Sequence, residues 1–234
     1  MRLFVFSILF IFPVAVFSQL GFYPVKLENF NFEEKSSRSL IAYKLPFRGD
    51  NYKFYGTITY HVFENAYADC KVHNAIVESF KVSENNCPET HFKIRKASKR
   101  RSGKLLPYVE KKSGFNADFM TPMKKNGKEM KFYYRTGLLG RFKNFDSEGF
   151  SKSNKKISLD FDNMSQYIIN LENSANKYGL RIKRIVFNRH YLKKLYASKS
   201  GEELKKKDIY FAKYLSRKVN RKYDDLFHVD FEMK

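Results

Sequence analysis

Residues 164–178 carry the clearest secondary-structure signal in the chain. Apolar side chains recur there at steps of three and four residues, the spacing of one helical face. They are Met164, Tyr167, Ile168, Leu171, Ala175 and Tyr178. We expect a capping box from Asn163 and Gln166 at its start and a stop at Gly179. A helix with one apolar stripe must bury it against other elements, which constrains how the chain folds.

Short stretches of alternating polar and apolar residues predict β-strands around this helix. These stretches are 52–61, 91–97, 116–123, 157–161, 182–187 and 227–231. The turn Lys125-Asn126-Gly127-Lys128 predicts a hairpin whose second strand is 128–134. Further helices are expected at 66–82, 190–197 and 203–214. Without an internal repeat, this mixture predicts one α+β domain with a small antiparallel sheet flanked by helices.

Residues 1–18 have the pattern of a secretory signal peptide. Arg2 precedes an apolar run that ends at Phe17, and Ser18 is suited to the cleavage point. Retention as a membrane anchor is the alternative, but Pro13 interrupts a run shorter than the roughly 20 residues of a membrane span. We therefore expect an exported chain, periplasmic or extracellular, with a wrapping segment at 19–50 and the folded domain at 51–234.

The chain is strongly basic, with 45 Lys and Arg against 24 Asp and Glu and a net charge of +21. A charge excess of this size suits an anionic partner. For an exported protein, an anionic envelope polymer is a more natural partner than nucleic acid. Lysine-rich solvated surfaces also occur without any ligand, so both interpretations stay open.

The two cysteines, Cys70 and Cys87, allow one disulfide. An even number of cysteines in an exported chain favours a bridge, which would stabilise the fold by roughly 3 kcal/mol. The alternative is two buried free thiols. Neither cysteine lies in a CxxC or histidine-rich context, so a metal role is not expected.

Six motifs follow one another in an order that is similar to a known family. They are Ser102-Gly103-Lys104, Lys112 to Met120, Lys125-Asn126-Gly127, Leu159-Asp160-Phe161, Lys183 to Phe187 and Tyr223 to Phe231. In this order they resemble the penicillin-insensitive murein endopeptidases, of the lysostaphin, D-Ala-D-Ala peptidase and hedgehog superfamily of zinc peptidases. The resemblance covers residues 65–234 and implies a hedgehog/D-Ala-D-Ala-peptidase-like fold with a role at peptidoglycan.

The resemblance also implies where a zinc site would lie. Asp118 and His228 stand at two positions where the family has metal ligands. Lys111 stands at the position of a third ligand, Leu226 at that of the catalytic base, and Tyr223 at that of another family histidine. An ammonium group has no lone pair for a metal, and leucine cannot accept a proton. We therefore expect a catalytically impaired homologue without a cofactor.

Alternatives at this site remain open. The Lys111 ammonium group either takes the metal position and pairs with Asp118, or points to solvent beside Lys112. A missing zinc ligand can also come from elsewhere in the chain, which would make the protein an active zinc-dependent peptidoglycan endopeptidase. The candidate donors are His91, His190, Asp224, Asp225 and Asp230.

A groove that has lost its catalytic groups can still bind its polymer. On this resemblance, aromatic residues would form the walls of a cleft and basic residues would face the acidic groups of peptidoglycan peptides. The cleft residues would be Arg101, Tyr108, Lys111, Lys112, Phe115, Asp118, Tyr223, Phe227 and His228. The predicted function is binding of peptidoglycan peptides in the envelope. An alternative of another class is a basic exported protein that binds anionic polymer or nucleic acid through its surface.

Overall fold

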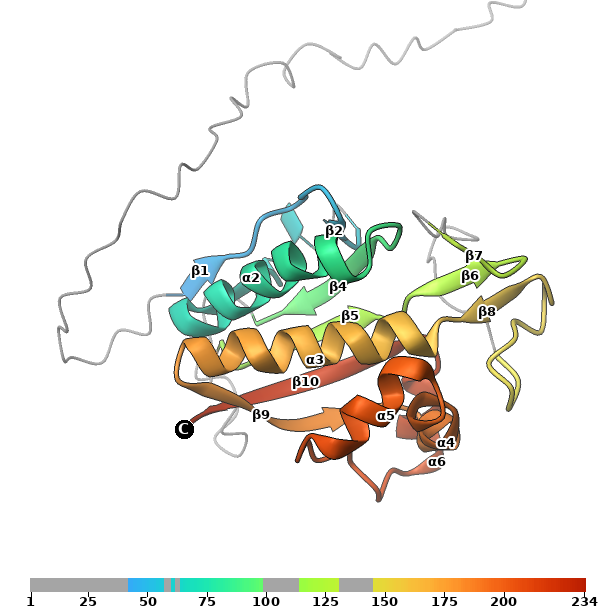
Figure 1. Cartoon of the computed structure of the whole chain (residues 1–234). Coiled ribbons are helices and arrows are strands. Elements are labelled where there is room, and N and C mark those ends of the chain that lie inside the picture. Colours follow the sequence, from blue (N-terminus) through green and yellow to red (C-terminus); the bar gives the residue numbers. More distant parts are fainter. Residues whose placement is uncertain (1–41, 57–59, 62–63, 99–113, 131–144) are drawn as a thin grey trace, which may run out of the picture. The chain divides into compact units, whose positions relative to one another are not determined.

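The computed structural model describes residues 42–56, 60–61, 64–98, 114–130 and 145–234 (Figure 1). These residues all belong to one compact unit, Ser39–Lys234. Helices and strands are mixed along the chain, so the fold class is α+β, as predicted. The predicted signal peptide and most of the predicted wrapping segment lie outside the described residues.

The elements follow the chain as labelled in Figure 1. They are β1 (Ala42–Lys44), β2 (Tyr52–Phe54), β3 (Tyr67–Asp69), α2 (Cys70–Asn86), β4 (Phe92–Ala97), β5 (Asn116–Met120), β6 (Met123–Lys125), β7 (Lys128–Glu129), β8 (Ile157–Leu159), α3 (Phe161–Lys177), β9 (Leu180–Val186), the 3-10 helix η1 (Arg189–Tyr191), α4 (Leu192–Tyr196), α5 (Lys199–Lys206), α6 (Arg217–Lys222) and β10 (Leu226–Met233). In the described part of the chain, no helix has the length and apolar character needed to cross a membrane.

The largest sheet in the described residues has five strands in the order β2-β4-β5-β10-β9. Three of its pairs are antiparallel, as predicted, whereas β2 and β4 are parallel. A parallel pair needs a crossover connection, and β3 with α2 lies between these two strands in the chain. Two smaller sheets, β1-β3 and β7-β6-β8, are antiparallel.

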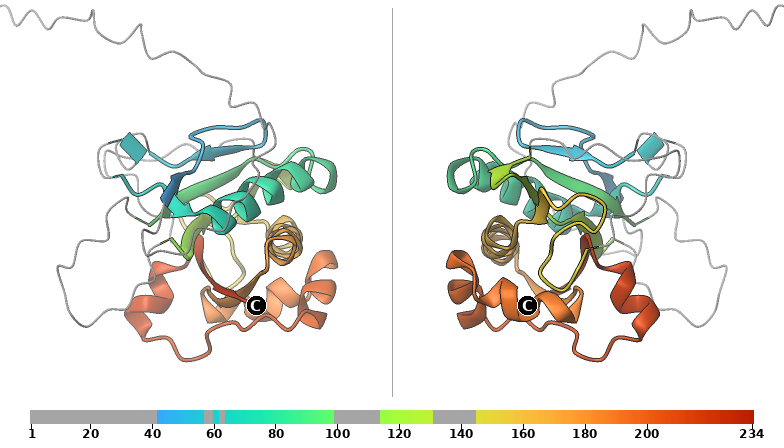
Figure 2. Two further views of the ribbon diagram at one scale, coloured as in Figure 1. Left: turned by 90° about the vertical axis from the view of Figure 1, so that its left-hand side faces the viewer. Right: turned by 90° about the vertical axis from the view of Figure 1, so that its right-hand side faces the viewer.

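Helices α2 and α3 lie along one side of the five-stranded sheet, and α6 lies on the other (Figure 2). The helices and the sheet share an aromatic core around Tyr167 of α3. Its ring stacks on Phe80 of α2 and Phe92 of β4, with centroids 5.3 and 4.6 Å away. It also meets Phe119 of β5 edge-on at 5.3 Å. One continuous set of aromatic rings therefore joins the layer of helices α2 and α3 to the five-stranded sheet.

The helix predicted from the apolar stripe at residues 164–178 is confirmed as α3, but its N-terminal cap differs from the prediction. The helix begins at Phe161, and the Asp160 carboxylate accepts a hydrogen bond from the backbone N–H of Asn163 at 3.2 Å. The expected capping box from Asn163 and Gln166 is therefore wrong, because both residues already lie inside the helix. Gly179 has a φ of +70° just beyond the helix end, as predicted for a residue that terminates a helix.

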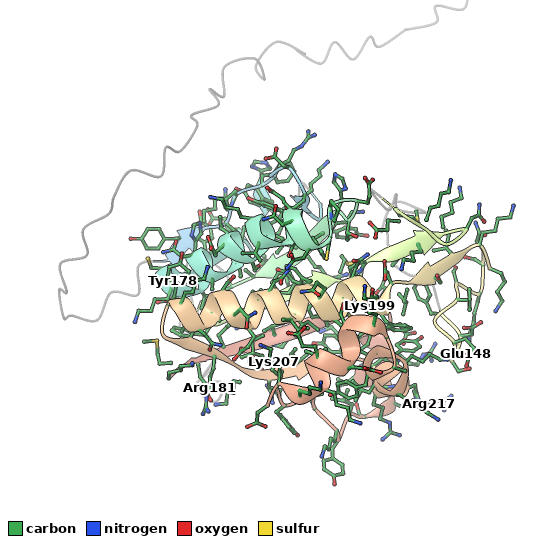
Figure 3. All side chains as sticks on the ribbon, in the orientation of Figure 1. Glu148, Tyr178, Arg181, Lys199, Lys207 and Arg217 are labelled. Carbon is green, nitrogen blue, oxygen red and sulfur yellow. The ribbon has the colours of Figure 1, made fainter. Side chains whose placement is uncertain are left out.

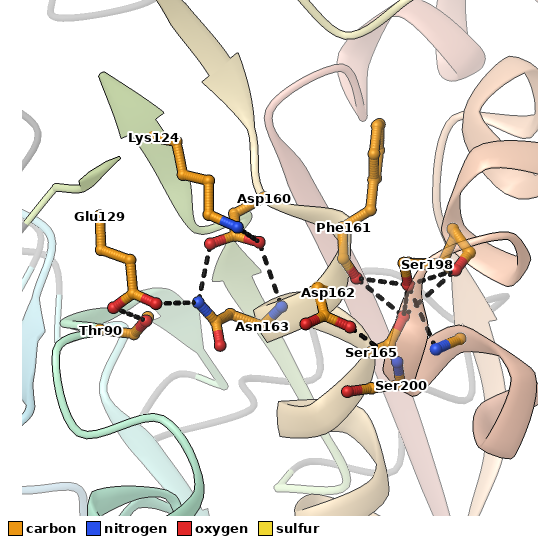
Figure 4. A network of polar contacts seen from close by, with 12 residues as sticks. Thr90, Lys124, Glu129, Asp160, Phe161, Asp162, Asn163, Ser165, Ser198 and Ser200 are labelled. Atoms are coloured by element: carbon orange, nitrogen blue, oxygen red, sulfur yellow. Dashed lines mark hydrogen bonds and ion pairs between the residues drawn. The ribbon is translucent and has the colours of Figure 1, made fainter. Parts of the chain in front are cut away.

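A network of side chains fixes the start of α3 (Figure 4). Asp160 forms an ion pair with Lys124 of β6 at 3.0 Å and accepts a hydrogen bond from the Asn163 side chain at 2.7 Å. The same Asn163 amide donates to Glu129 of β7 at 2.7 Å. Glu129 in turn accepts a hydrogen bond from Thr90 at 2.8 Å. The network therefore ties α3 to the three-stranded sheet and to the segment after α2.

Strands β6 and β7 form the predicted hairpin. Asn126 and Gly127 have φ angles of +52° and +75°, and Lys125 pairs with Lys128 across the turn. A two-residue turn of type I′ requires φ above zero at both central residues, which Asn-Gly accepts more readily than other pairs. The part of the predicted second strand from residue 131 lies outside the described residues.

Several predicted boundaries are wrong. Strand β2 ends at Phe54, and residues 60–61 are helical rather than extended. The helix expected from residue 66 begins at Cys70, because residues 67–69 form β3 and Asp69 caps the helix by accepting from the N–H of Lys71 at 2.9 Å. The helix expected at 203–214 is α5, which ends at Lys206. Helix α6 was not predicted.

The predicted disulfide does not form. Cys70 is the first residue of α2, and Cys87 is its C-cap. A helix of 17 residues rises about 25 Å, whereas bridged cysteines have Cα atoms less than about 7 Å apart. Both cysteines are free thiols, and Cys87 is buried, which corresponds to the alternative of two free thiols.

Candidate functional site

The face of the five-stranded sheet that points away from α2 and α3 carries Asp118 and His228. Side chains alternate along β10, so Phe227 points toward α3 and approaches Tyr167, with ring centroids 6.4 Å apart. His228 therefore points to the other side, which we call the open face because neither α2 nor α3 covers it. The antiparallel register places His228 directly opposite Asp118 of β5, although 110 residues separate them in the sequence.

The imidazole ring of His228 lies between two carboxylates. Its Nδ1 is 2.5 Å from Oδ1 of Asp118, and its Nε2 is 2.9 Å from Oδ1 of Asp230 on the same strand. A carboxylate can only accept, so both ring nitrogens donate and the ring is an imidazolium. Burial of the ring opposes this charge, but the hydrogen bonds and charges of Asp118 and Asp230 outweigh it and raise the pKa of His228 to about 9.

Two basic side chains extend this arrangement across the sheet. Lys96 of β4 lies 3.6 Å from Oδ2 of Asp118, and Arg184 of β9 donates two hydrogen bonds to Oδ2 of Asp230 at 2.6 and 2.9 Å. We call the five residues Lys96, Asp118, His228, Asp230 and Arg184 the charge ladder. Its charges alternate in sign over four neighbouring strands, so each carboxylate lies between two cations.

The charge ladder keeps both carboxylates ionised. Burial would raise the pKa of Asp118, which is 2% exposed, but His228 and then Lys96 hold the pKa below its usual value. Burial would likewise raise the pKa of Asp230, but His228 and Arg184 lower it. A buried carboxylate is costly unless it is paired and hydrogen-bonded, and the ladder supplies both conditions.

The described residues of this site do not fit a catalytic zinc ion. A zinc-bound histidine offers the lone pair of one nitrogen and donates from the other. Both nitrogens of His228 donate to carboxylates, so no lone pair remains for a metal. In the described part of the chain, no three His, Cys, Asp or Glu side chains form a group that could hold a metal ion. Lys111, at the remaining ligand position, lies outside the described residues.

Leu226 and Tyr223 occupy the other two positions that the resemblance marks. Leu226 is 1% exposed and packs with Met120 and Val186 in a small apolar cluster on the open face. Tyr223 belongs to the same cluster, and its ring centroid is 6.5 Å from that of His228. Burial, and then the charges of the nearby carboxylates, raise the pKa of Tyr223 to about 12. Both side chains therefore belong to one apolar cluster, which meets the charge ladder at the ring of Tyr223.

The predicted cleft residues do not all lie on the open face. Phe227 is fully buried on the helix side of β10, where it stacks on Phe119 at 5.5 Å, so its predicted place in a cleft wall is wrong. The alternation of a strand explains this, because neighbours of an open-face residue point into the core. Phe115 is partly buried against the main core. Arg101, Tyr108, Lys111 and Lys112 lie outside the described residues.

The five candidate donors for a missing zinc ligand lie in different parts of the structure. Asp230 joins the charge ladder, but as a hydrogen-bond acceptor of His228. His190 and Asp224 line a cavity at the end of β9, and His91 lines a different, small cavity beside Met120. Asp225 is buried, and its backbone carbonyl accepts from the N–H of Thr121 at 2.9 Å.

The cavity at the end of β9 was not predicted from the sequence. It has a volume of about 690 Å³ and lies among residues 145–152, η1 and α6. Basic side chains of all three segments line it: Lys152, Arg189, Arg217 and Arg221, together with His190. Figure 3 labels Arg217 and shows it far from Arg181, which belongs to the start of β9.

The floor of this cavity is a network of buried amides. Asn188 accepts hydrogen bonds from the backbone N–H of His190 at 3.0 Å and from the side chain of Asn220 at 2.7 Å. Asn220 accepts from the backbone N–H of Arg189 at 2.9 Å. The Asn188 amide donates to Asp224 at 2.5 Å. These bonds connect η1 to α6 and fix the backbone of Arg189 and His190 at the edge of the cavity.

A local sequence pattern places Asp230 beside His228, whereas no local pattern indicates Lys96 or Arg184. Residues two apart on a strand share a face, so His228 on the open face implies Asp230 beside it. Lys96 and Arg184 depend on the register of three strand pairs. That register shifts at irregularities after Ile94 and after Asp230, which no local pattern reveals.

No family model matches the chain, and no curated protein matches it. The family resemblance therefore depends on the sequence motifs. What it implies about the specific fold, the activity and the location stays a prediction.

Proposed function

We propose that this chain is an exported, catalytically impaired homologue of the murein endopeptidases that binds peptidoglycan peptides on the open face of its sheet. Three features support the proposal. The six motifs keep the order of the family, Asp118 and His228 lie on adjacent strands with their side chains in contact, and the fold is α+β. A hedgehog/D-Ala-D-Ala-peptidase-like arrangement of the sheet is part of the same proposal.

One observation carries the loss of catalysis: both nitrogens of His228 donate to carboxylates. A histidine in this state is neither a metal ligand nor a general base, because each role needs a free nitrogen lone pair. The leucine at position 226 adds to this, since a buried apolar side chain fills the position of the family's base.

This face can still bind a ligand because the two ends of the charge ladder, Lys96 and Arg184, reach solvent. The Lys96 and Arg184 side chains are 45% and 49% exposed. Each carries a positive charge that is only partly compensated by one carboxylate of the ladder. Peptidoglycan peptides carry free carboxylates, and guanidinium and ammonium groups are the usual partners of carboxylates in proteins.

The test measures zinc, cleavage and binding on the same purified chain. We expect no stoichiometric zinc after zinc loading and gel filtration, no cleavage of peptidoglycan cross-links, and co-sedimentation with peptidoglycan sacculi. The double variant Lys96→Gln/Arg184→Gln should co-sediment less. Lys177→Gln is the matched control, because Lys177 is exposed on α3, which covers the other side of the sheet.

Any one of three outcomes would overturn the proposal. One zinc per chain that is lost in Asp118→Ala and His228→Ala, together with chelator-sensitive cleavage, would establish the active zinc-dependent endopeptidase instead. Failure of the unmodified chain to co-sediment, or equal co-sedimentation of the double variant and the control, would show that the open face does not bind peptidoglycan peptides.

A further inference from the structure

We propose that the cavity at the end of β9 binds a small hydroxylated oxyanion, a sugar phosphate or a sugar carboxylate. This site shares no residue with the charge ladder, and the inference does not depend on the proposed function. Its volume of about 690 Å³ lies within the roughly 300–1,000 Å³ of small-molecule sites in proteins. The cavity is therefore large enough for one or two sugar units.

The basic side chains around the cavity favour binding of an anion. Lys152, Arg189, Arg217 and Arg221 line it, and none of the four forms an ion pair with a described residue. Of the two carboxylates in the lining, Asp146 is already engaged by Lys155. Like charges held in one cavity repel each other, and a bound oxyanion relieves this repulsion. Guanidinium groups bind phosphate and carboxylate in bidentate geometry, which favours an oxyanion over a simple halide.

The remaining carboxylate, Asp224, indicates that the ligand also carries a hydroxyl group. Its Oδ1 accepts a hydrogen bond from Asn188, and Oδ2 has no hydrogen-bond donor among the described residues. Burial raises the pKa of Asp224, while Asn188, Arg221 and Lys152 act in the other direction. A half-buried carboxylate oxygen in a cavity lined by four cations is a suitable acceptor for a sugar hydroxyl, which donates without adding charge.

The backbone of the site is fixed before any ligand arrives. Asn188 and Asn220 are 4% and 5% exposed, and their side chains bond each other and the backbone N–H groups of Arg189 and His190. The backbones of η1 and α6 are thereby held against each other. A site whose supporting residues are already ordered loses less entropy on binding, so this network favours recognition over a merely solvated basic surface.

The test is calorimetric titration of the full chain with four probes: glucose 6-phosphate, glucuronate, inorganic phosphate and glucose. We expect binding of at least one sugar oxyanion, stronger than that of inorganic phosphate and of glucose. The ratio of the first two affinities tells whether phosphate or carboxylate is preferred. Arg217→Gln/Arg221→Gln should weaken binding by about tenfold or more. Both side chains are exposed, so the variant should fold, which far-UV circular dichroism checks.

Two further variants make the result specific. Arg181→Gln is the matched control, since Arg181 is an exposed arginine at the opposite end of the sheet and should leave the affinity unchanged. Asp224→Asn should reduce the preference for glucose 6-phosphate over inorganic phosphate, because it alters the acceptor for the hydroxyl group. No binding of either sugar oxyanion, or equal weakening by the double variant and by Arg181→Gln, would refute the site.

Discussion

At the residue scale, the charge of His228 is the property on which the open face depends. The ring donates to one carboxylate on the neighbouring strand and to another on its own strand. The same two bonds that remove its lone pairs also stabilise the imidazolium. A histidine that would be neutral at pH 7.5 in an unfolded chain is therefore charged in the folded one.

This charge makes stability depend on pH. The pKa of His228 is raised from 6.5 to about 9, so its contribution is complete below pH 6.5 and is lost as pH rises through 9. The contribution amounts to roughly 3 kcal/mol. We expect the difference in unfolding free energy between the unmodified chain and His228→Gln to shrink by about this amount between pH 6 and pH 10. Urea denaturation over this range measures it, and a constant difference would show that His228 is not charged by its place in the charge ladder.

The two cysteines give a second prediction at this scale. Burial raises the pKa of Cys87 to about 12 and, with the charge of Asp69, also raises the pKa of Cys70. Because the thiolate is the reactive form, both thiols should react slowly with a disulfide reagent in the folded chain. Without reductant, the urea-unfolded chain should show two thiols, and Cys70→Ser should show one. An unfolded chain with no reactive thiol would mean that a bridge exists after all.

At the element scale, what could be predicted depends on how local the signal is. The apolar stripe of α3, the Asn126-Gly127 turn and the alternation in β4 are local patterns, and each predicted its element. Helix α6 has six residues, four of them basic, and no apolar period. Strand β1 exists through its pairing with β3, a partner more than twenty residues away. Such elements depend on tertiary contacts and leave little trace in the sequence.

The start of α3 offers a test of the corrected cap. Asp160→Ala removes the acceptor for the Asn163 N–H and the partner of Lys124, and should lower the unfolding free energy by about 1–2 kcal/mol. Asp160→Asn keeps an acceptor and should cost less. Gln166→Ala is the control, because that side chain donates to Asn170 further along the helix. Equal losses in both Asp160 variants would show that the ion pair, and not the cap, matters.

At the scale of the whole described unit, the candidate site is a product of sheet topology. The sequence motifs indicate Asp118 and His228, and strand periodicity places Asp230 beside His228. The remaining members, Lys96 and Arg184, come from the two flanking strands. Their positions depend on strand order and on two shifts in register. For the same reason the basic cavity was not predicted, since it combines three segments that lie far apart in the chain.

The aromatic core makes the helices and the sheet one cooperative unit, with Tyr167 at its centre. Tyr167→Ala should lower the unfolding free energy by about 3–5 kcal/mol, because a fully buried ring that contacts both layers is lost. Tyr167→Phe should leave the unfolding free energy nearly unchanged. The hydroxyl of Tyr167 lies at a long hydrogen-bond distance of 3.4 Å from that of Ser79, whose single proton is donated to the carbonyl of Ile76 at 2.7 Å, so little is lost with it.

The measurement is urea unfolding followed by far-UV circular dichroism and by tyrosine fluorescence, which is usable because the chain has no tryptophan. The two probes should give coincident transitions in the unmodified chain and in both variants, since neither layer keeps its core without the other. Transitions that separate in Tyr167→Ala would mean that the helices and the sheet unfold independently. The shared rings would then be a contact between two stable layers and not the common core of one unit.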